Sequence, residues 1–461
     1  MLVLIAPLDW GLGHATRCIP LIRALERAGH TVVACAAGAG ARLLRAEFPH
    51  LTVEEIPGHA MTYTKQRALL PAWLLAQLPL YLLGVWRERR AARRLARRHG
   101  AGLIIADGRY GFRAPGIPAV FVTHQLEIVP PGPAWLRAAL APLLRRLNTR
   151  ALRGFSEVWV PDFAGPVNLS GTLGHPAARG DVGPPGQGPG GRQGVAGLHT
   201  SSRLPGPDIA SGVRVAYIRP LCRFRPVDAP WTLPRRASST QAIQSAGPAA
   251  PPLDILALVS GPEPQRSLFE QKLRTALETV PGTHVLVRGV PGARAQPPQP
   301  PTIRAGALTV FDHVPGERLA AFLEAAGRVV CRSGYTTMME LAGVAQANVL
   351  LVPTPGQPEQ EMLAVHARRN GYAAWQDQDA LDVDAGLREA ASLPGFGKLT
   401  GGGGGEGERG EGPAFILSEW VAAHPLLAER PVSGERAAQV AQVAQVDLGH
   451  SGRSGHSGYS G

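Results

Sequence analysis

The chain has 461 residues, enough for two domains with separate hydrophobic cores. A hydrophobic fraction of 44% and a charged fraction of 18% indicate a globular protein and exclude a long coiled coil. The formal net charge of +12 is carried mainly by arginine. Arginine binds phosphates as a planar fork, so acidic ligands and anionic membrane surfaces are the partners to consider.

Cysteine usage and the N-terminus favour a reducing compartment. The four cysteines are scattered and form no C-x-x-C pair, which argues against a zinc site or a disulfide framework. The opening MLVLIAP lacks a basic region and a cleavage site, so it is interpreted as a first strand and not as a signal peptide. We therefore expect a cytoplasmic protein that binds no metal.

Residues 1–165 alternate between strand and helix patterns. Apolar strands are expected at 2–6, 31–36, 103–106, 119–123 and 157–160, and helices after the glycine turn at 9–17 and over 133–153. This alternation predicts a doubly wound, parallel α/β domain. The strand ends carry His14, Asp107, His124 and Glu127, where open parallel sheets bind ligands.

Two common nucleotide sites are disfavoured. The glycine turn Gly11-Leu12-Gly13-His14 is not followed by an acidic residue after the second strand, which argues against NAD. The chain has no G-x-x-x-x-G-K-[ST] motif, so it is not a P-loop NTPase.

An uncharged segment at 68–86, rich in leucine and aromatic residues, precedes a strongly basic helix at 87–98. Three interpretations remain open: a membrane span, an interfacial amphipathic segment with an arginine collar, or a buried or cleft-lining helix pair. Pro71, Gln77, Pro79 and Gly84 argue against a lipid-facing span.

The rest of the chain divides into three parts. Residues 166–252 are rich in Gly and Pro and are expected to be a largely disordered linker or insertion, with a short ordered island at 217–224. Residues 253–394 again alternate between strands and helices and predict a second Rossmann-like domain. Residues 395–461 form a low-complexity tail in which only 414–427 could be helical.

The most informative stretch runs from Val329 to Leu363. It predicts strand, polar turn, helix, strand, polar turn and helix, with Ser333 as N-cap of the first helix and the second helix beginning near Pro358. Two helix N-termini that point into one crevice make an anion site, for which a diphosphate is the natural ligand.

These motifs resemble glycosyltransferase family 28, whose best-known relative adds N-acetylglucosamine to the lipid-linked peptidoglycan precursor. The resemblance rests on Gly11-Leu12-Gly13-His14, on Ser333-Gly334-x-Thr336-x-x-x-Glu340 and on the P-x-P-G-Q-x-x-Q turn at 353–360. It covers about residues 1–165 and 253–393. It implies a GT-B fold: two Rossmann-like doubly wound domains that face one another across a cleft, with a disordered linker insertion and tail.

The resemblance also implies roles. Glu340 would accept hydrogen bonds from the ribose hydroxyls of a nucleotide. The remaining donor residues for nucleotide and diphosphate would be Ser260, Gly261, Arg288, Ser333, Gly334 and Thr336. Gln357, Glu359 and Gln360 would bind the donor sugar. The acceptor-side loop would contain Gly11, Gly13 and His124.

The implied reaction is hexosyl transfer from a nucleotide-diphospho-sugar, most simply a UDP-sugar, to an unidentified acceptor that could be lipid-linked. Helix N-termini, with Arg288 or Arg332, would meet the charge of the leaving diphosphate without a metal or a cofactor. The acceptor hydroxyl needs a general base, for which His14 is the first candidate and Asp107 the second. The family implies inversion. A sugar-nucleotide epimerase and a non-catalytic, membrane-peripheral binding protein remain as alternatives; no nucleic acid is expected.

Overall fold

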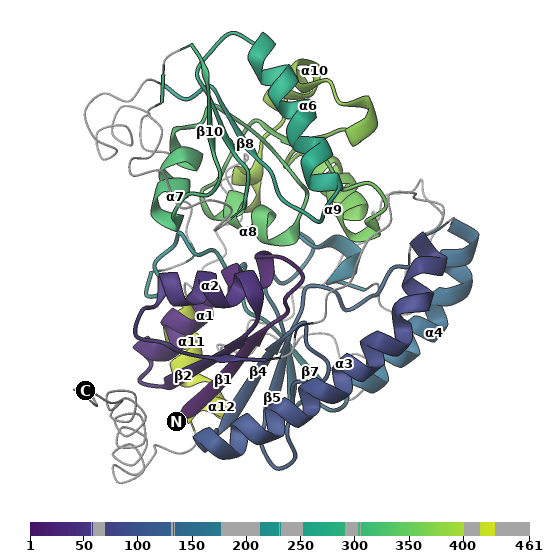
Figure 1. Ribbon diagram of the computed structural model, residues 1–461, viewed down its shortest axis with the longest axis vertical. Helices are drawn as coiled ribbons and strands as arrows, with labels where there is room; N and C mark the ends of the chain where they lie inside the picture. Colours follow the sequence, from purple (N-terminus) through teal and green to yellow (C-terminus); the bar gives the residue numbers. More distant parts are fainter. Residues whose placement is uncertain are drawn as a thin grey trace, which may run out of the picture.

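The computed structural model describes residues 1–56, 58, 70–130, 132, 134–176, 213–229, 231, 252–290, 303–304, 306–400 and 415–428. Most of the predicted linker and tail lies outside these ranges. The described chain forms two α/β lobes, one above the other in Figure 1.

The first lobe is built on a seven-stranded sheet of order β3-β2-β1-β4-β5-β6-β7. Its strands are β1 (Leu2–Pro7), β2 (Thr31–Ala36), β3 (Thr52–Glu55), β4 (Leu103–Asp107), β5 (Ala119–Val122), β6 (Glu157–Val160) and β7 (Arg214–Tyr217). Its helices are α1 (Gly13–Arg27), α2 (Gly38–Glu47), α3 (Leu70–His99) and α4 (Ala134–Leu152), with a short 3-10 turn η2 (Gly171–Leu173).

The second lobe is built on a six-stranded sheet of order β10-β9-β8-β11-β12-β13. Its strands are β8 (Ile255–Leu258), β9 (His284–Val287), β10 (Leu308–Phe311), β11 (Arg328–Cys331), β12 (Val349–Leu351) and β13 (Ala374–Trp375). Its helices are α6 (Gln265–Thr279), α7 (Gly316–Ala325), α8 (Tyr335–Gly343), α9 (Pro358–Arg369) and α10 (Val383–Ala391), with 3-10 turns η3 (Gln378–Ala380) and η4 (Phe396–Thr400).

Every strand pair in both sheets is parallel. The central strands β1, β4 and β11 are buried almost throughout, because helices cover both faces of a parallel sheet. In each sheet the strand order reverses beside the first strand, between β1 and β4 and between β8 and β11. Ligands bind at such switch points. The predicted pair of doubly wound domains is confirmed.

The chain passes from the first lobe to the second and then back to the first. β7 falls inside the segment predicted to be a linker, yet it pairs with β6 and extends the first sheet. Near the C-terminal end of the described chain, α11 (Leu417–Ala423) packs against α1, and α12 (Pro425–Ala428) follows it. His424 contacts Glu157 of β6 at 2.9 Å. The chain therefore returns from the second lobe to the first.

Two local expectations need correction. The apolar and basic segments at 68–98 are not a helix pair, because α3 is one helix of 30 residues with Pro79 inside it. In the described part of the chain no helix is both long and apolar enough to cross a bilayer. Ser333 is not the N-cap of α8: Gly334 holds that position, and the Ser333 hydroxyl donates to the Gln360 carbonyl at 2.7 Å.

Candidate functional site

The carboxyl ends of the two sheets meet directly. The first turn of α8 contacts the glycine turn of the first lobe, where Thr336 Oγ1 donates to the Gly13 carbonyl at 3.1 Å. A Cβ at Gly13 would lie 3.0 Å from Thr336 Oγ1, so a larger residue there would push the Thr336 side chain back. The Tyr335 hydroxyl donates to the Pro161 carbonyl at 2.8 Å. The predicted acceptor-side loop therefore faces the predicted phosphate helix.

A buried cluster lies at this junction, where α1 begins and β4 ends. His14 Nδ1 is 3.2 Å from Asp107 Oδ2, and Asp107 is fully buried. Arg17, one turn after His14, donates from Nε to both Asp107 oxygens at 2.9 Å. Burial alone would raise the pKa of Asp107, but the Arg17 guanidinium and the His14 ring hold that pKa far below its usual value. Asp107 is therefore a carboxylate at neutral pH.

Sequence reasoning did not assign a role to Arg17. Its Nη2 lies 2.8 Å from His14 Nδ1, and its Nη1 lies 3.1 Å from His124 Nδ1. The spacing from His14 to Arg17 was the available signal, because residues three apart on a helix share a face. Arg17 is 2% exposed and joins both histidines to Asp107.

His14 Nδ1 has two competing contacts, the donor Arg17 Nη2 and the acceptor Asp107 Oδ2. Nδ1 cannot accept from Arg17 and also donate to Asp107. Only donation to Asp107 leaves the Nε2 lone pair open, which a general base requires. Desolvation is the largest cause that lowers the pKa of His14, and the nearby Arg17 charge lowers it further. The His14 ring is therefore neutral at pH 7.

The second histidine of the cluster crosses between the lobes. His124 Nε2 contacts Glu359 Oε1, in the first turn of α9, at 2.7 Å. The His124 ring also stacks on Tyr335 of α8, with centroids 4.0 Å apart and planes 3° apart. Five side chains, His14, Asp107, Arg17, His124 and Glu359, thus form one polar network that spans the cleft.

Glu340, the predicted ribose ligand, lies on the buried side of α8 and is 5% exposed. Its Oε1 is 2.7 Å from Arg223 Nε, in ion-pair contact although the two groups are not aligned as a hydrogen bond. Burial raises the pKa of Glu340, and Arg223 opposes this shift. Arg223 lies in the short island at 217–224 of the predicted linker, where no local pattern indicates a pairing with Glu340.

The predicted phosphate turns lie at the ends of β8, β11 and β12. Gly261 has φ +109, which favours glycine, and a Cβ there would lie 3.5 Å from Thr354 Oγ1. Thr354 is 1% exposed and its hydroxyl has no partner among the described atoms. Its backbone N–H donates to Gln360 Oε1 at 2.9 Å. An unpaired buried hydroxyl beside a glycine turn is a feature that a bound anion would explain.

The two arginines proposed to meet the diphosphate charge are engaged elsewhere. Arg288 donates to Glu270 at 2.7 Å and to Asp312 at 2.5 Å. Arg332 is fully buried, binds the Val352 and Pro353 carbonyls at 3.1 Å and stacks on Phe269. Desolvation lowers the pKa of Arg332 to about 9. Arg332 therefore holds the strand ends together, and the structure does not bring either guanidinium into the polar network.

The three residues predicted to bind the sugar all lie at the start of α9. Gln357 occupies the N-cap position, and its side-chain oxygen accepts from Gln360 Nε2 at 2.6 Å. Glu359 faces His124, as described above. Among the described residues, no group of three or more His, Cys, Asp or Glu side chains could hold a metal ion.

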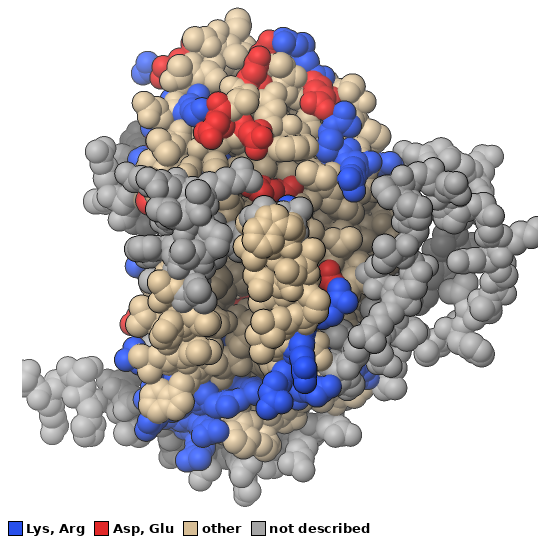
Figure 2. Space-filling view, turned by 90° about the vertical axis from the view of Figure 1, so that its right-hand side faces the viewer, with Lys and Arg blue, Asp and Glu red and all other residues tan. Residues whose placement is uncertain are grey.

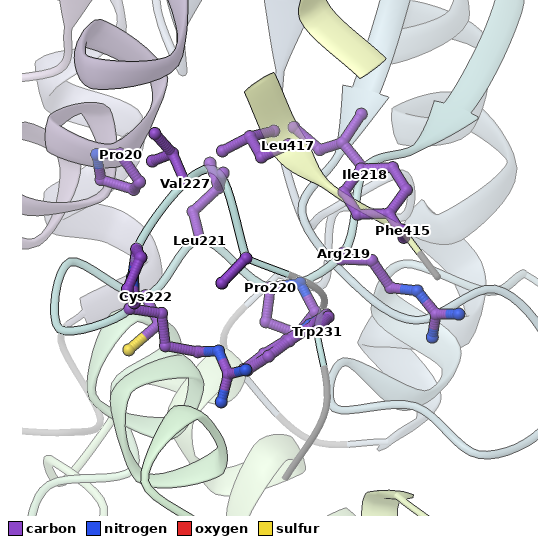
Figure 3. A pocket seen from close by; sticks show the side chains of 13 residues that line it. Pro20, Ile218, Arg219, Pro220, Leu221, Cys222, Val227, Trp231, Phe415 and Leu417 are labelled. Atoms are coloured by element: carbon purple, nitrogen blue, oxygen red, sulfur yellow. The ribbon is translucent and has the colours of Figure 1, made fainter. Parts of the chain in front are cut away.

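A small cavity of about 40 Å³ lies where the 218–231 segment meets α1 and the chain before α11. Figure 3 shows a mostly apolar wall that includes Leu221, Val227 and Leu417, with the guanidinium of Arg219 directed away from it. Small-molecule sites usually have several hundred Å³, so this cavity is too small for a nucleotide-sugar.

No family model matches the chain, and no curated protein matches it. Among solved structures, the glycotransferase of kitacinnamycin is 16% identical with a TM-score of 0.49, covering 87% of this chain and 92% of its own. Spinosyn rhamnosyltransferase SpnG complexed with thymidine diphosphate is 18% identical with a TM-score of 0.48, and the match covers 96% of this chain and 100% of that one. Acinetobacter baumannii MurG is 13% identical with a TM-score of 0.41, and the match covers 96% of this chain and 99% of that one.

Similarity at this level does not establish an activity, so function has to rest on this chain's own residues. The topology itself is decisive for the fold. Two parallel Rossmann-like sheets face one another through their carboxyl ends, and the chain returns to the first lobe through α11. The chain has the GT-B architecture.

Proposed function

We propose that the protein is a metal-independent glycosyltransferase that moves a hexosyl group from a nucleotide-diphospho-sugar, with UDP as the first nucleotide to test. One observation carries the proposal. The His14–Asp107 pair lies against the first turns of α8 and α9, through Thr336 to Gly13 and through Glu359 to His124. A candidate base thus faces two helix N-termini, which is the arrangement that transfer from a diphosphate needs.

The donor would bind on the second lobe. The N–H groups that open α8 and α9 and the Ser260-Gly261 turn would contact the diphosphate. The unpaired Thr354 hydroxyl supports this placement, because a phosphate oxygen would accept its hydrogen bond. Glu340 would bind the ribose once Arg223 moved aside. No cofactor is proposed, since the nucleotide-sugar is a substrate.

The acceptor would bind beside the first lobe. His14 Nε2 would take the proton from the acceptor hydroxyl, whose oxygen then attacks the anomeric carbon as the bond to the diphosphate breaks. The nucleoside diphosphate leaves with the bonding electrons, and attack from the opposite side inverts that carbon. Asp107 would stabilise the imidazolium, and Arg17 is a positioning residue that holds Asp107 and both histidines in place.

Calorimetry with UDP, TDP, GDP and UDP-sugars tests the donor site. We expect at least one of these nucleotides to bind, and Glu340→Ala to weaken that binding about tenfold or more, the loss expected for a charged hydrogen-bond acceptor. Glu278→Ala, an exposed glutamate of α6, is the control and should bind as the parent does. Undetectable binding of every nucleotide would refute the proposal.

Product analysis separates transfer from the alternative reaction. An epimerised donor formed without any acceptor would indicate a sugar-nucleotide epimerase, whereas slow donor hydrolysis is expected of a transferase. We also propose that transfer takes place at the cytoplasmic face of a membrane, because exposed leucines and tryptophans on α3 and α4 lie beside exposed arginines (Figure 2).

A further inference from the structure

Tyr335 is a residue of the second lobe whose side chain reaches into the first. It is the first residue of α8, directly after the Gly334 N-cap, and it is buried. Its hydroxyl donates to the carbonyl of Pro161, which directly follows β6, at 2.8 Å. Tyr335 occupies the unspecified position of the motif Ser333-Gly334-x-Thr336, so the resemblance implies no role for it. Its contacts have to explain why a large aromatic side chain lies there.

The ring of Tyr335 lies flat against the ring of His124. Their centroids are 4.0 Å apart and their planes differ by 3°. Carbon atoms pack at about 3.5–4.0 Å, so the imidazole has no space to turn out of this plane. Burial, followed by the nearby Asp162 carboxylate, raises the pKa of Tyr335 well above its ordinary value, so its hydroxyl remains a donor to Pro161. Tyr335 is thus fixed at its far end and restrains the orientation of His124.

The partners of His124 determine which of its ring nitrogens carries the proton. Arg17 Nη1 lies 3.1 Å from His124 Nδ1, and a guanidinium can only donate, so Nδ1 accepts. The proton is therefore on Nε2, which donates to Glu359 Oε1 at 2.7 Å. Both nitrogens reach their partners only while the ring keeps the plane that Tyr335 sets. A carboxylate of the second lobe is in this way connected through His124 to Arg17.

The orientation of Arg17 in turn affects His14. Arg17 Nη2 lies closer to Asp107 Oδ1 than to His14 Nδ1, which is 2.8 Å away. A guanidinium that turned from Asp107 towards His14 would donate to Nδ1. The His14 proton would then be on Nε2, and the ring could not act as a base there. The bond from Nη1 to His124 opposes that turn, so His14 Nδ1 is left to donate to Asp107.

We infer that Tyr335 is a positioning residue for the base: through His124 and Arg17 it keeps His14 in the form that can accept a proton at Nε2. Its catalytic meaning rests on the proposed function. Tyr335 and Glu359 belong to the first turns of α8 and α9, the helices whose N-termini would bind the diphosphate. The base is therefore complete only while the second lobe is docked on the first. A chain with separated lobes holds the donor without a competent base, which limits loss of the donor to water.

Nitrogen NMR of the full chain with isotope-labelled histidine tests this inference without any substrate. Spectra of His14→Gln and His124→Gln assign the two rings, and the nitrogen shifts show which nitrogen of each carries the proton. At pH 8 we expect the proton on Nδ1 of His14 and on Nε2 of His124, both in the parent and in Tyr335→Phe, which keeps the stacked ring. Tyr335→Leu loses that ring and should give a mixture of the two His14 forms.

Donor turnover with UDP-glucose and UDP-N-acetylglucosamine gives a second readout. Tyr335→Leu should lower kcat about ten- to a hundredfold, as for a misplaced catalytic group, while the Kd for UDP changes by less than about threefold. Tyr335→Phe should keep most of the turnover. A residue that only stabilised the fold would not separate kcat from Kd in this way.

Phe322→Leu is the matched control, because Phe322 is a buried aromatic residue of the same lobe that packs on Phe311 of β10. It should lower the thermal midpoint but leave both histidines in their parent forms. Should Tyr335→Leu not fold, Tyr335→Met repeats the comparison, since its flexible side chain fills the same space.

The same His14 form in the parent and in Tyr335→Leu would overturn the inference. Equal losses of kcat in Tyr335→Phe and Tyr335→Leu, or a loss of UDP binding as large as the loss of kcat, would overturn it as well. A parent that binds no nucleotide would refute the proposed function instead, and the NMR comparison would still decide whether Tyr335 sets the form of His14.

Discussion

Replacing Arg17 by methionine tests how much the buried ion pair with Asp107 stabilises the fold. Arg17 is the buried cation that binds Asp107, which is itself fully buried. Removing one partner of a buried ion pair costs about 3–5 kcal/mol, because a charge is left without compensation. For a domain of this size 1 kcal/mol corresponds to about 2–4 °C, so Arg17→Met should lower the thermal midpoint on the order of 10 °C at pH 8.

The stability lost in Arg17→Met should depend on pH, because the charge of Asp107 does. The pKa of Asp107 is depressed in the native chain, so its pair stabilises the fold above the unfolded pKa of about 3.9 and is lost as pH falls towards the native value. Without Arg17, burial should raise the pKa of Asp107. The deficit of Arg17→Met relative to the parent should then be larger at pH 8 than at pH 5.

Scanning calorimetry at the two pH values measures both effects. Asp107→Asn combined with Arg17→Met should lose less stability than the sum of the single variants, because the pair contributes only when both partners are present. Arg42→Met, at an exposed position on α2, is the control and should change the midpoint by less than about 2 °C. A deficit in Arg17→Met no larger than that of the control, or one that does not change with pH, would show that Arg17 and Asp107 are not a stabilising buried pair.

Three further outcomes are expected. Glu359→Ala removes the contact with His124 that joins the lobes, so the radius of gyration measured by small-angle X-ray scattering should increase. The control Glu278→Ala should leave it unchanged, and identical radii for the two variants would contradict the prediction. Thr354→Val removes an unpaired buried hydroxyl, so it should leave the midpoint of the free chain unchanged or higher while weakening nucleotide binding; a clear loss of stability would mean that the hydroxyl has a partner. Burial raises the pKa of the thiols, for Cys222 and Cys331 to about 12, so the native chain should resist alkylation at pH 8 and react fully in urea; fast labelling of the native chain would show that its thiols are accessible.

Periodicity was sufficient for most of the architecture. Short apolar runs such as 2–6 and 329–331 have only one stable place, the interior of a parallel sheet, and the structure puts β1 and β11 there. The Gly- and Pro-rich composition of 166–252 predicts a linker, in which only 217–224 is expected to be ordered. The segment at 214–217 lies mostly outside that island. Pairing with β6 makes it a strand, and that tertiary contact leaves no signal in the local sequence.

The site was predictable as a set of positions but not as a set of partners. Strand ends in a parallel sheet must converge, so His14, Asp107 and His124 could be grouped from the sequence. The pairing of Glu340 with Arg223 joins residues more than a hundred positions apart, and that of Glu359 with His124 crosses between the lobes. Such pairs depend on how the lobes pack, which residue type and spacing do not specify.

The division of labour between the two lobes is measured by comparing His14→Ala with Glu340→Ala. Nucleotide binding by calorimetry and donor turnover by product analysis are determined on the same samples. We expect Glu340→Ala to lose binding, and His14→Ala to keep binding and lose turnover, because the proposed donor site and the proposed base belong to different lobes. Two variants that bind and turn over the donor as the parent does would contradict it.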